Sequence, residues 1–352
     1  MDFEQNDSMS GPSGPEAAEP IPGMSSGGAV ARTASKGIGW KILFGIILAV
    51  SVVANIALVL MLIGIIAIFT TGPRGVFTEE VIRKGPARTK VAVIALEGII
   101  HSEQAKSVYK QLKAARQDRR VKGLILRVNS PGGTISGSDQ IYREIRKFRQ
   151  ETNKPVVAFM QGVAASGGYY ASVACDEIIA EPTTITGSIG VISWYIVVQE
   201  LLEDKLGVLP VVIKSGRKKD WPSSFRKPEE EEKQYLRDKV LTPAYERFVE
   251  VVAEGRKGLL TVEQIRPLAD GGIFGAQEAQ KEKLIDQIGY LDEAIELVKS
   301  LAGIEKAQVV QYRKPFSLSD FLMYRKSNLL RINRNTLYEL GAPQILYLWT
   351  AY

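Results

Sequence analysis

One stretch of this 352-residue chain constrains its fold more than any other, because the 29 residues from Ile42 to Thr70 include no charged side chain. As an α-helix the stretch would extend roughly 43 Å, whereas the hydrocarbon core of a bilayer is about 30 Å thick. A cleaved signal peptide has a shorter apolar region, of about 7 to 15 residues, nearer the start of the chain. We therefore expect one membrane-spanning helix within residues 39–72.

The regions beside this helix set the domain organisation. Residues 1–38 are rich in Gly, Ser, Pro and Ala, and we expect a disordered tail because such a segment buries too little apolar surface to offset its ordering entropy. Basic side chains lie on both sides of the apolar stretch, so the positive-inside rule does not decide its orientation. The net charge of +6 suits anionic lipid, and no nucleic-acid recognition motif accompanies it. Cys175 is the only cysteine, which excludes an intrachain disulfide and a thiolate metal cage and is typical of a packed core thiol.

Strand and helix signals alternate over residues 85–304, and this pattern predicts an α/β domain with largely parallel pairing. The apolar runs that we interpret as strands are Val91–Leu96, Gly123–Val128, Pro155–Met160, Asp176–Ala180 and Leu209–Ile213. Amphipathic periodicity predicts helices over Ser138–Arg149 and Gln234–Gly255. Residues 305–352 mix basic and large apolar side chains, which is typical of a packing arm or of contact with a membrane or another subunit.

A serine in a small-residue turn is the candidate nucleophile. Ser166 follows the third predicted strand within Ala164–Tyr170 and needs a base to take its proton. The only histidine is His101, which lies far away in the sequence with nothing nearby to suggest a triad. A lysine can act instead if it is neutral, which costs about 4.6 kcal/mol at pH 7 for a solvated amine and calls for burial. Lys214, Lys218 and Lys219 are all candidates, and the residues alone do not choose among them.

Two glycine-bearing turns supply backbone amides for an oxyanion. One turn is Pro131-Gly132-Gly133, and the other donor is the amide of Gly167, directly after the candidate nucleophile. A third turn, Thr186–Gly190, carries Ser188, whose hydroxyl is suited to orienting a lysine amine. Each motif is weak alone, but each follows a predicted strand.

Four segments in this order resemble the signal peptide peptidase A family in its short, membrane-anchored form, namely 129–133, 164–170, 186–191 and 214–220. The resemblance implies a crotonase/Clp-protease-like superhelical βαβ fold without a cofactor or metal. It also implies that Ser166 is the nucleophile, that Lys219 is the general base and that Ser188 orients the lysine. Gly133 and Gly167 match the oxyanion amides, with Gly132 as an alternative to Gly133.

The same resemblance implies a homo-oligomeric ring or dome, in which serine and lysine come from neighbouring protomers. It implies a single-pass protein of the cell membrane whose catalytic domain faces away from the cytoplasm and degrades residual signal peptides and other apolar peptides. From the residues themselves, pairing of Ser166 and Lys219 within one chain stays open. Two rival functions also stay open, an acyl-CoA hydratase or isomerase on the same fold and a membrane scaffold without catalysis.

Overall fold

The computed structural model describes residues 37–70, 77–313 and 344–350, which fall into two units. The described residues of the first unit form one helix, α1 (Gly37–Thr70), and the part from Gly39 to Ile66 is long and apolar enough to cross a membrane. No other helix within the described ranges meets that criterion. The disorder expected for residues 1–38 falls almost wholly outside the described residues, as do residues 314–343 of the tail.

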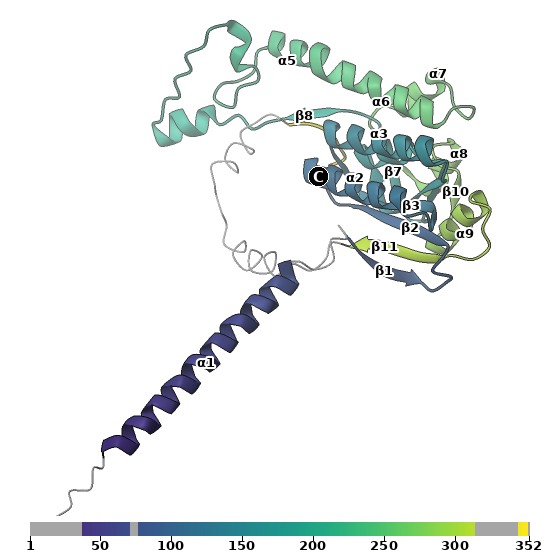
Figure 1. Ribbon diagram of the computed structural model, residues 1–352. Coiled ribbons are helices and arrows are strands. Elements are labelled where there is room, and N and C mark those ends of the chain that lie inside the picture. The colour runs from purple at the N-terminus through teal and green to yellow at the C-terminus, as the bar shows by residue number, and fades with distance from the viewer. Residues whose placement is uncertain (1–36, 71–76, 314–343, 351–352) are drawn as a thin grey trace, which may run out of the picture. The chain divides into compact units, whose positions relative to one another are not determined.

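The second unit is built on a nine-stranded sheet (Figure 1). The strand order is β1-β11-β2-β3-β5-β6-β10, with β7 paired to β5 and β9 to β7, and only β1–β11 and β7–β9 are antiparallel. The predicted α/β class is therefore confirmed. The strands are β1 (Thr78–Arg83), β2 (Lys90–Glu97), β3 (Val121–Ser130), β5 (Val156–Ala165), β6 (Glu177–Ala180), β7 (Ile185–Gly187), β9 (Ile273–Gly275), β10 (Gln287–Ile288) and β11 (Gln308–Arg313).

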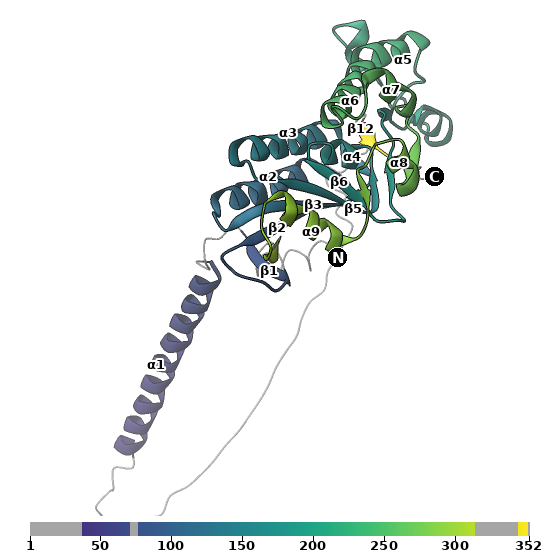
Figure 2. The same cartoon turned by 90° about the vertical axis from the view of Figure 1, so that its right-hand side faces the viewer.

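Helices cover both faces of this sheet (Figure 2). Alternate side chains of a strand point to opposite faces, and β2 follows that rule. Ala92 and Ile94 join the apolar core under α2 (Ser102–Gln117), α3 (Ile135–Thr152) and α6 (Thr242–Gly255), whereas Val91 and Val93 pack with α9 (Leu291–Leu301). The short helical segments α4 (Gly167–Ser172), α7 (Val262–Ile265), η4 (Arg266–Leu268) and α8 (Ala276–Lys281) complete this part of the unit.

A small second sheet lies at the C-terminal end of β3. It contains β4 (Gly132–Thr134), β12 (Gln344–Leu348) and β8 (Ile192–Trp194), and β12 is antiparallel to both neighbours. Tyr347 of β12 is fully buried, stacks on Tyr170 and donates a hydrogen bond of 2.7 Å from its hydroxyl to the Ala244 carbonyl oxygen. The end of the tail is therefore part of the folded domain.

Residues 195–229, which we call the arm, form the least regular part of the domain. A π-helical turn, η1 (Leu201–Lys205), and a 3-10 turn, η2 (Arg217–Asp220), are its regular elements. The strand predicted over Leu209–Ile213 is wrong, because within residues 37–70, 77–313 and 344–350 this segment pairs with no strand, and its side chains are exposed or half-buried. The helix predicted over Gln234–Gly255 falls within a longer helical run made of α5 (Glu230–Leu236), a π turn, η3 (Arg237–Leu241), and α6.

Candidate active site

Ser166 lies between the end of β5 and the start of α4, in a backbone conformation that few serines adopt. Its φ is 52° and its ψ is −113°, and the residue is only 1% exposed. Its amide donates a hydrogen bond of 2.8 Å to the Gly187 carbonyl oxygen, and its own carbonyl accepts one of 2.8 Å from the Tyr170 amide. A positive φ in a side-chain-bearing residue persists only where its surroundings hold it, and such residues cluster at functional sites.

The two glycine turns predicted from the sequence meet at Ser166. A methyl group on Gly167 would lie 3.1 Å from the Gly132 Cα and 3.2 Å from the Gly133 amide nitrogen, so the two turns are in close contact. Hydrogen bonds of 2.7 Å, from the Ile100 amide to the Gly132 carbonyl, and 2.8 Å, from the Thr134 amide to the Ile100 carbonyl, fix this loop. Because successive amides of a strand point to opposite sides, the Gly133 amide faces away from Ile100, toward β12.

Ser188 is brought to the same place. It follows Gly187, the residue that accepts the Ser166 amide, and its own amide donates a hydrogen bond of 2.7 Å to the Gly272 carbonyl oxygen. It is 7% exposed and has a φ of 49°, so the site contains two buried serines with positive φ. The fold thus gathers Ser166, Ser188, Gly133 and Gly167, although these residues lie in three separate turns.

Lys219 lies elsewhere, in η2 of the arm, and its side chain is exposed. No hydrogen bond or ion pair joins it to Ser166 or Ser188 within the described residues. The two rival lysines are engaged locally. Lys214 donates a hydrogen bond of 2.7 Å to the Asp220 carboxylate, and Lys218 lies 4.3 Å from the ring centre of Tyr235.

His101 and Cys175, the only histidine and the only cysteine of the chain, have structural roles. The Nδ1 of His101 accepts a hydrogen bond of 3.2 Å from the Gln104 amide and so caps α2 at its N-terminus. Burial raises the pKa of the Cys175 thiol, which keeps it protonated and unreactive at neutral pH. In the ranges that the structure covers, no cluster of three or more His, Cys, Asp or Glu side chains is arranged to hold a metal.

Strand β12 is the feature of this site that sequence reasoning missed. Tyr347 lies opposite Gly133 in the register, and the Trp349 amide donates a hydrogen bond of 2.8 Å to the Pro131 carbonyl oxygen. The tail therefore runs as an extended chain along the glycine turn beside Ser166. The apolar run of residues 345–349 was the only sequence signal, and it does not identify the strand with which it pairs.

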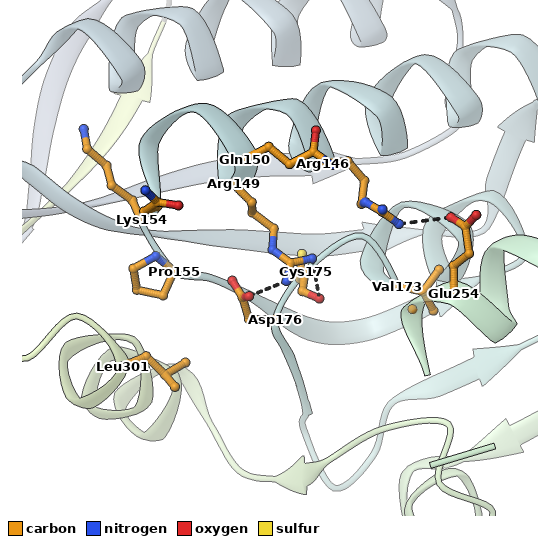
Figure 3. A pocket seen from close by; sticks show the side chains of 12 residues that line it. Arg146, Arg149, Gln150, Lys154, Pro155, Val173, Cys175, Asp176, Glu254 and Leu301 are labelled. Atoms are coloured by element: carbon orange, nitrogen blue, oxygen red, sulfur yellow. Dashed lines mark hydrogen bonds and ion pairs between the residues drawn. The ribbon is translucent and has the colours of Figure 1, made fainter. Parts of the chain in front are cut away.

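A cavity of about 620 Å³ between the ends of α3, α4 and α6 is separate from Ser166, Ser188 and the glycine turn (Figure 3). Its charged side chains already have partners. Arg146 lies 3.0 Å from Glu254, Arg149 pairs with Asp176, and the Lys154 amine donates a hydrogen bond of 3.1 Å to the Ala115 carbonyl. Because its arginines pair with carboxylates and the Lys154 amine binds a backbone carbonyl, the cavity does not compete with the glycine turns as the reactive site.

The chain is similar to known peptidases. The model of peptidase family S49 matches residues 148–305, and the model of Clp protease matches residues 86–184. The "Putative signal peptide peptidase SppA" of Enterococcus faecium is 37% identical over 247 residues, which cover 67% of this chain and 70% of that protein. Serine protease SPPA of Arabidopsis thaliana, a chloroplastic protein, is 33% identical over 71% of this chain and 36% of its own length. Protease 4 of Salmonella typhi is 34% identical, over 60% and 34% respectively.

The S49 match covers both Ser166 and the arm, and the Clp protease match covers Ser166. They favour a peptidase over the hydratase and scaffold alternatives, since the similar proteins are named as peptidases or proteases.

Proposed function

Because the chain belongs to peptidase family S49 and is a serine peptidase, we propose that it is a membrane-anchored endopeptidase with Ser166 as nucleophile and Lys219 as general base. Its substrates are apolar peptides at the membrane, residual signal peptides among them. The observation that carries this proposal is the strained, buried Ser166 against the glycine turn at Gly132 and Gly133.

The chemistry follows from these positions. The Ser166 hydroxyl oxygen attacks the peptide carbonyl while its proton passes to the neutral Lys219 amine. The amides of Gly133 and Gly167 donate to the oxyanion, and one such donor is worth about 2.7–4 kcal/mol in the transition state. Collapse of the intermediate expels the amine half of the peptide, which takes the proton from Lys219. Water then attacks the acyl-enzyme and loses a proton to Lys219. The Ser166 oxygen takes that proton as it leaves, which frees the acid half and restores the neutral amine.

Lys219 meets Ser166 between neighbouring copies of the chain in this proposal. The arm that carries Lys219 exposes a run of aliphatic side chains, and their exposed fractions range from 48% for Val212 to 96% for Ile213. A contiguous exposed apolar surface of this kind marks an interaction site. A homo-oligomeric ring or dome would cover the arm and deliver each lysine to an adjoining serine. The members of this run are Val208, Leu209, Val211, Val212 and Ile213.

The bound form of a substrate is suggested by β12. An extended peptide that adds to β4 in the antiparallel sense would place its backbone along Gly133, as the tail does at Tyr347. The neighbouring aromatic side chains, Tyr170 and Phe248, would then receive a large apolar side chain. This binding mode suits signal peptides, which contain a continuous apolar region of about 7 to 15 residues.

Helix α1 supports anchoring in a bilayer, and contact of the domain with lipid follows from that anchor. A single pass with the catalytic domain on the non-cytoplasmic side is the arrangement that we propose. Protease accessibility of the domain in intact and opened cells tests the side, because added protease digests only a domain outside the cytoplasm while the cell membrane is sealed.

The dyad is tested with Ser166→Ala and Lys219→Ala chains and a fluorogenic apolar peptide. Each chain alone is expected to be inactive, and an equimolar mixture is expected to regain up to about a quarter of wild-type turnover by random pairing of neighbours. Turnover by the Ser166→Ala chain alone would exclude the mechanism. If both variants are inactive and their mixture is inactive too, the dyad stands, but Ser166 and Lys219 then react within one chain.

A further inference from the structure

The residues on both sides of Lys219 are fastened, while Lys219 itself projects from η2 into solvent. Asp220 is the best held of these neighbours. One of its carboxylate oxygens accepts from the Lys214 amine at 2.7 Å, and the other accepts from the Arg226 Nε at 3.2 Å. Both oxygens of the carboxylate next to Lys219 are therefore already paired with cations.

This pairing continues into the body of the domain. Arg226 also donates from Nη1 to Glu232 at 2.7 Å, and Glu232 lies on α5 with no exposed surface. The side chains of Asp220 and Arg226 are only 13% and 27% exposed. Buried ion pairs are geometrically strict, because each charge must keep its partner to compensate for lost water. We call Lys214, Asp220, Arg226 and Glu232 the clamp.

A second set of contacts holds the other side of the turn less firmly. Arg217 lies 3.1 Å from Glu229 and 2.7 Å from Glu231, and these side chains are all at least half exposed. Ion pairs between exposed side chains contribute little, so they offer a matched control for the clamp.

We propose that the clamp is a positioning device for Lys219, an inference that rests on the proposed Ser166–Lys219 dyad. It acts in two ways. It ties η2 to α5, so that the Lys219 amine approaches the serine from a fixed base, and misplacement by about 1 Å costs a catalyst up to about 100-fold in rate. It also occupies both oxygens of Asp220, a carboxylate that would otherwise pair with the neighbouring amine and hold it in its charged form.

The test compares two clamp variants with the exposed control, all in the full-length chain. Asp220→Asn removes the central charge, and the double variant Arg226→Met with Glu232→Gln frees one Asp220 oxygen without leaving a buried unpaired charge. Both are expected to lower kcat by about 10-fold to 100-fold with KM within about two-fold of wild type. Arg217→Gln is expected to change kcat by less than about two-fold.

The pH profile of kcat separates positioning from a loss of folded protein. In the double variant the freed Asp220 oxygen pairs with Lys219, so the acidic limb of the profile moves to higher pH, whereas Asp220→Asn has no carboxylate to cause that movement. A smaller folded fraction would lower the whole profile and leave its limbs in place, which would overturn the proposal. Size-exclusion chromatography checks that each variant assembles as the wild type does.

The outcome also distinguishes the clamp from the dyad. If Lys219→Ala is inactive while both clamp variants keep kcat within about two-fold of wild type, the clamp is wrong and the dyad stands. If Lys219→Ala keeps its activity, the dyad itself is wrong. Should Asp220→Asn fail to assemble, Arg226→Lys keeps a second cation beside Asp220 in addition to Lys214 and is expected to retain more activity than the double variant. Equal activities would overturn the clamp.

Discussion

The core that holds Ser166 and the arm that holds Lys219 are built on opposite principles. Ser166 is 1% exposed, and its backbone is fixed by one hydrogen bond to Gly187 of β7 and another from Tyr170 of α4. The arm has few regular elements, exposes its aliphatic side chains and is tied down by ion pairs. The surroundings of Ser166 are thus complete within a single chain. Lys219, the other member of the proposed dyad, forms no hydrogen bond or ion pair with Ser166 in the described part of that chain. In the proposed mechanism, this difference makes the chemistry of each Ser166 depend on assembly with a second copy of the chain.

The largest effect should come from the arm, where lysines are numerous and only one is proposed to react. Lys219→Ala should lower kcat by about 10⁴-fold, because loss of a base that works as a unit with its nucleophile removes most of the rate enhancement. Lys218→Ala, which removes only a contact with Tyr235 and Trp221, should stay within about five-fold. Steady-state kinetics on the fluorogenic peptide measures both, and similar losses in the two variants would contradict the choice of Lys219.

In the core, the glycine turn should tolerate no side chain. An alanine at Gly133 would collide with the backbone of Ile100, so the loop must move and an oxyanion donor is displaced. We expect kcat to fall by about 10²-fold to 10³-fold. Gly216 of the arm is the control, since a methyl group there meets open space at a φ of −159°, and Gly216→Ala should be nearly neutral. Full activity of Gly133→Ala would exclude this amide as a donor.

The apolar surface of the arm should matter for assembly more than for folding. Ile213→Lys places a charge on a side chain that is 96% exposed and should weaken self-association by about 10-fold or more. Leu259→Lys, at a site 43% exposed outside the arm, should leave association unchanged. Analytical ultracentrifugation over a dilution series measures the dissociation constant of each variant. Equal dissociation constants for Ile213→Lys and Leu259→Lys would count against the arm as the interface.

The smallest expected effect is on the stability of the arm at low pH. Hydrogen bonds from Lys214 and then from Arg226 hold the pKa of Asp220 at about 2, below its ordinary value of 3.8. A lowered carboxyl pKa stabilises the folded arm above the ordinary value, and that stability is lost as the pH falls toward about 2. The arm should therefore keep its structure unchanged from about pH 5 upward. A ¹³C titration of the Asp220 carboxyl checks this, and a midpoint near its ordinary value would mean that the ion pairs do not persist in solution.

Most of the core was predictable from local signals. Continuous apolar runs such as Val91–Leu96 became buried parallel strands, since their side chains pack on both faces of the sheet. The Ser166 turn was predictable because small residues after a strand leave room for tight contacts between backbones. The glycine-flanked turn made Ser188 a candidate for orienting the lysine, and the structure adds that its φ is positive.

The arm and the tail were not predictable in the same way. Leu209–Ile213 has the composition of a strand but no neighbour to pair with in the described part of the chain, and strand propensity depends on such context. Residues 345–348 do pair, but with β4 and β8, which lie more than 140 residues earlier. A local pattern indicates that a strand is possible and does not identify its partner.

The position of β12 has a consequence for turnover. An incoming peptide that uses β4 finds that edge taken by residues 346–348, and it must displace them before it can reach Ser166. Because the occupant belongs to the same molecule, dilution does not release it, and its competition is equally strong at every enzyme concentration. Peptides at low concentration would then not be cleaved. A peptide that accumulates in the bilayer near α1 would reach the local concentration needed to displace β12.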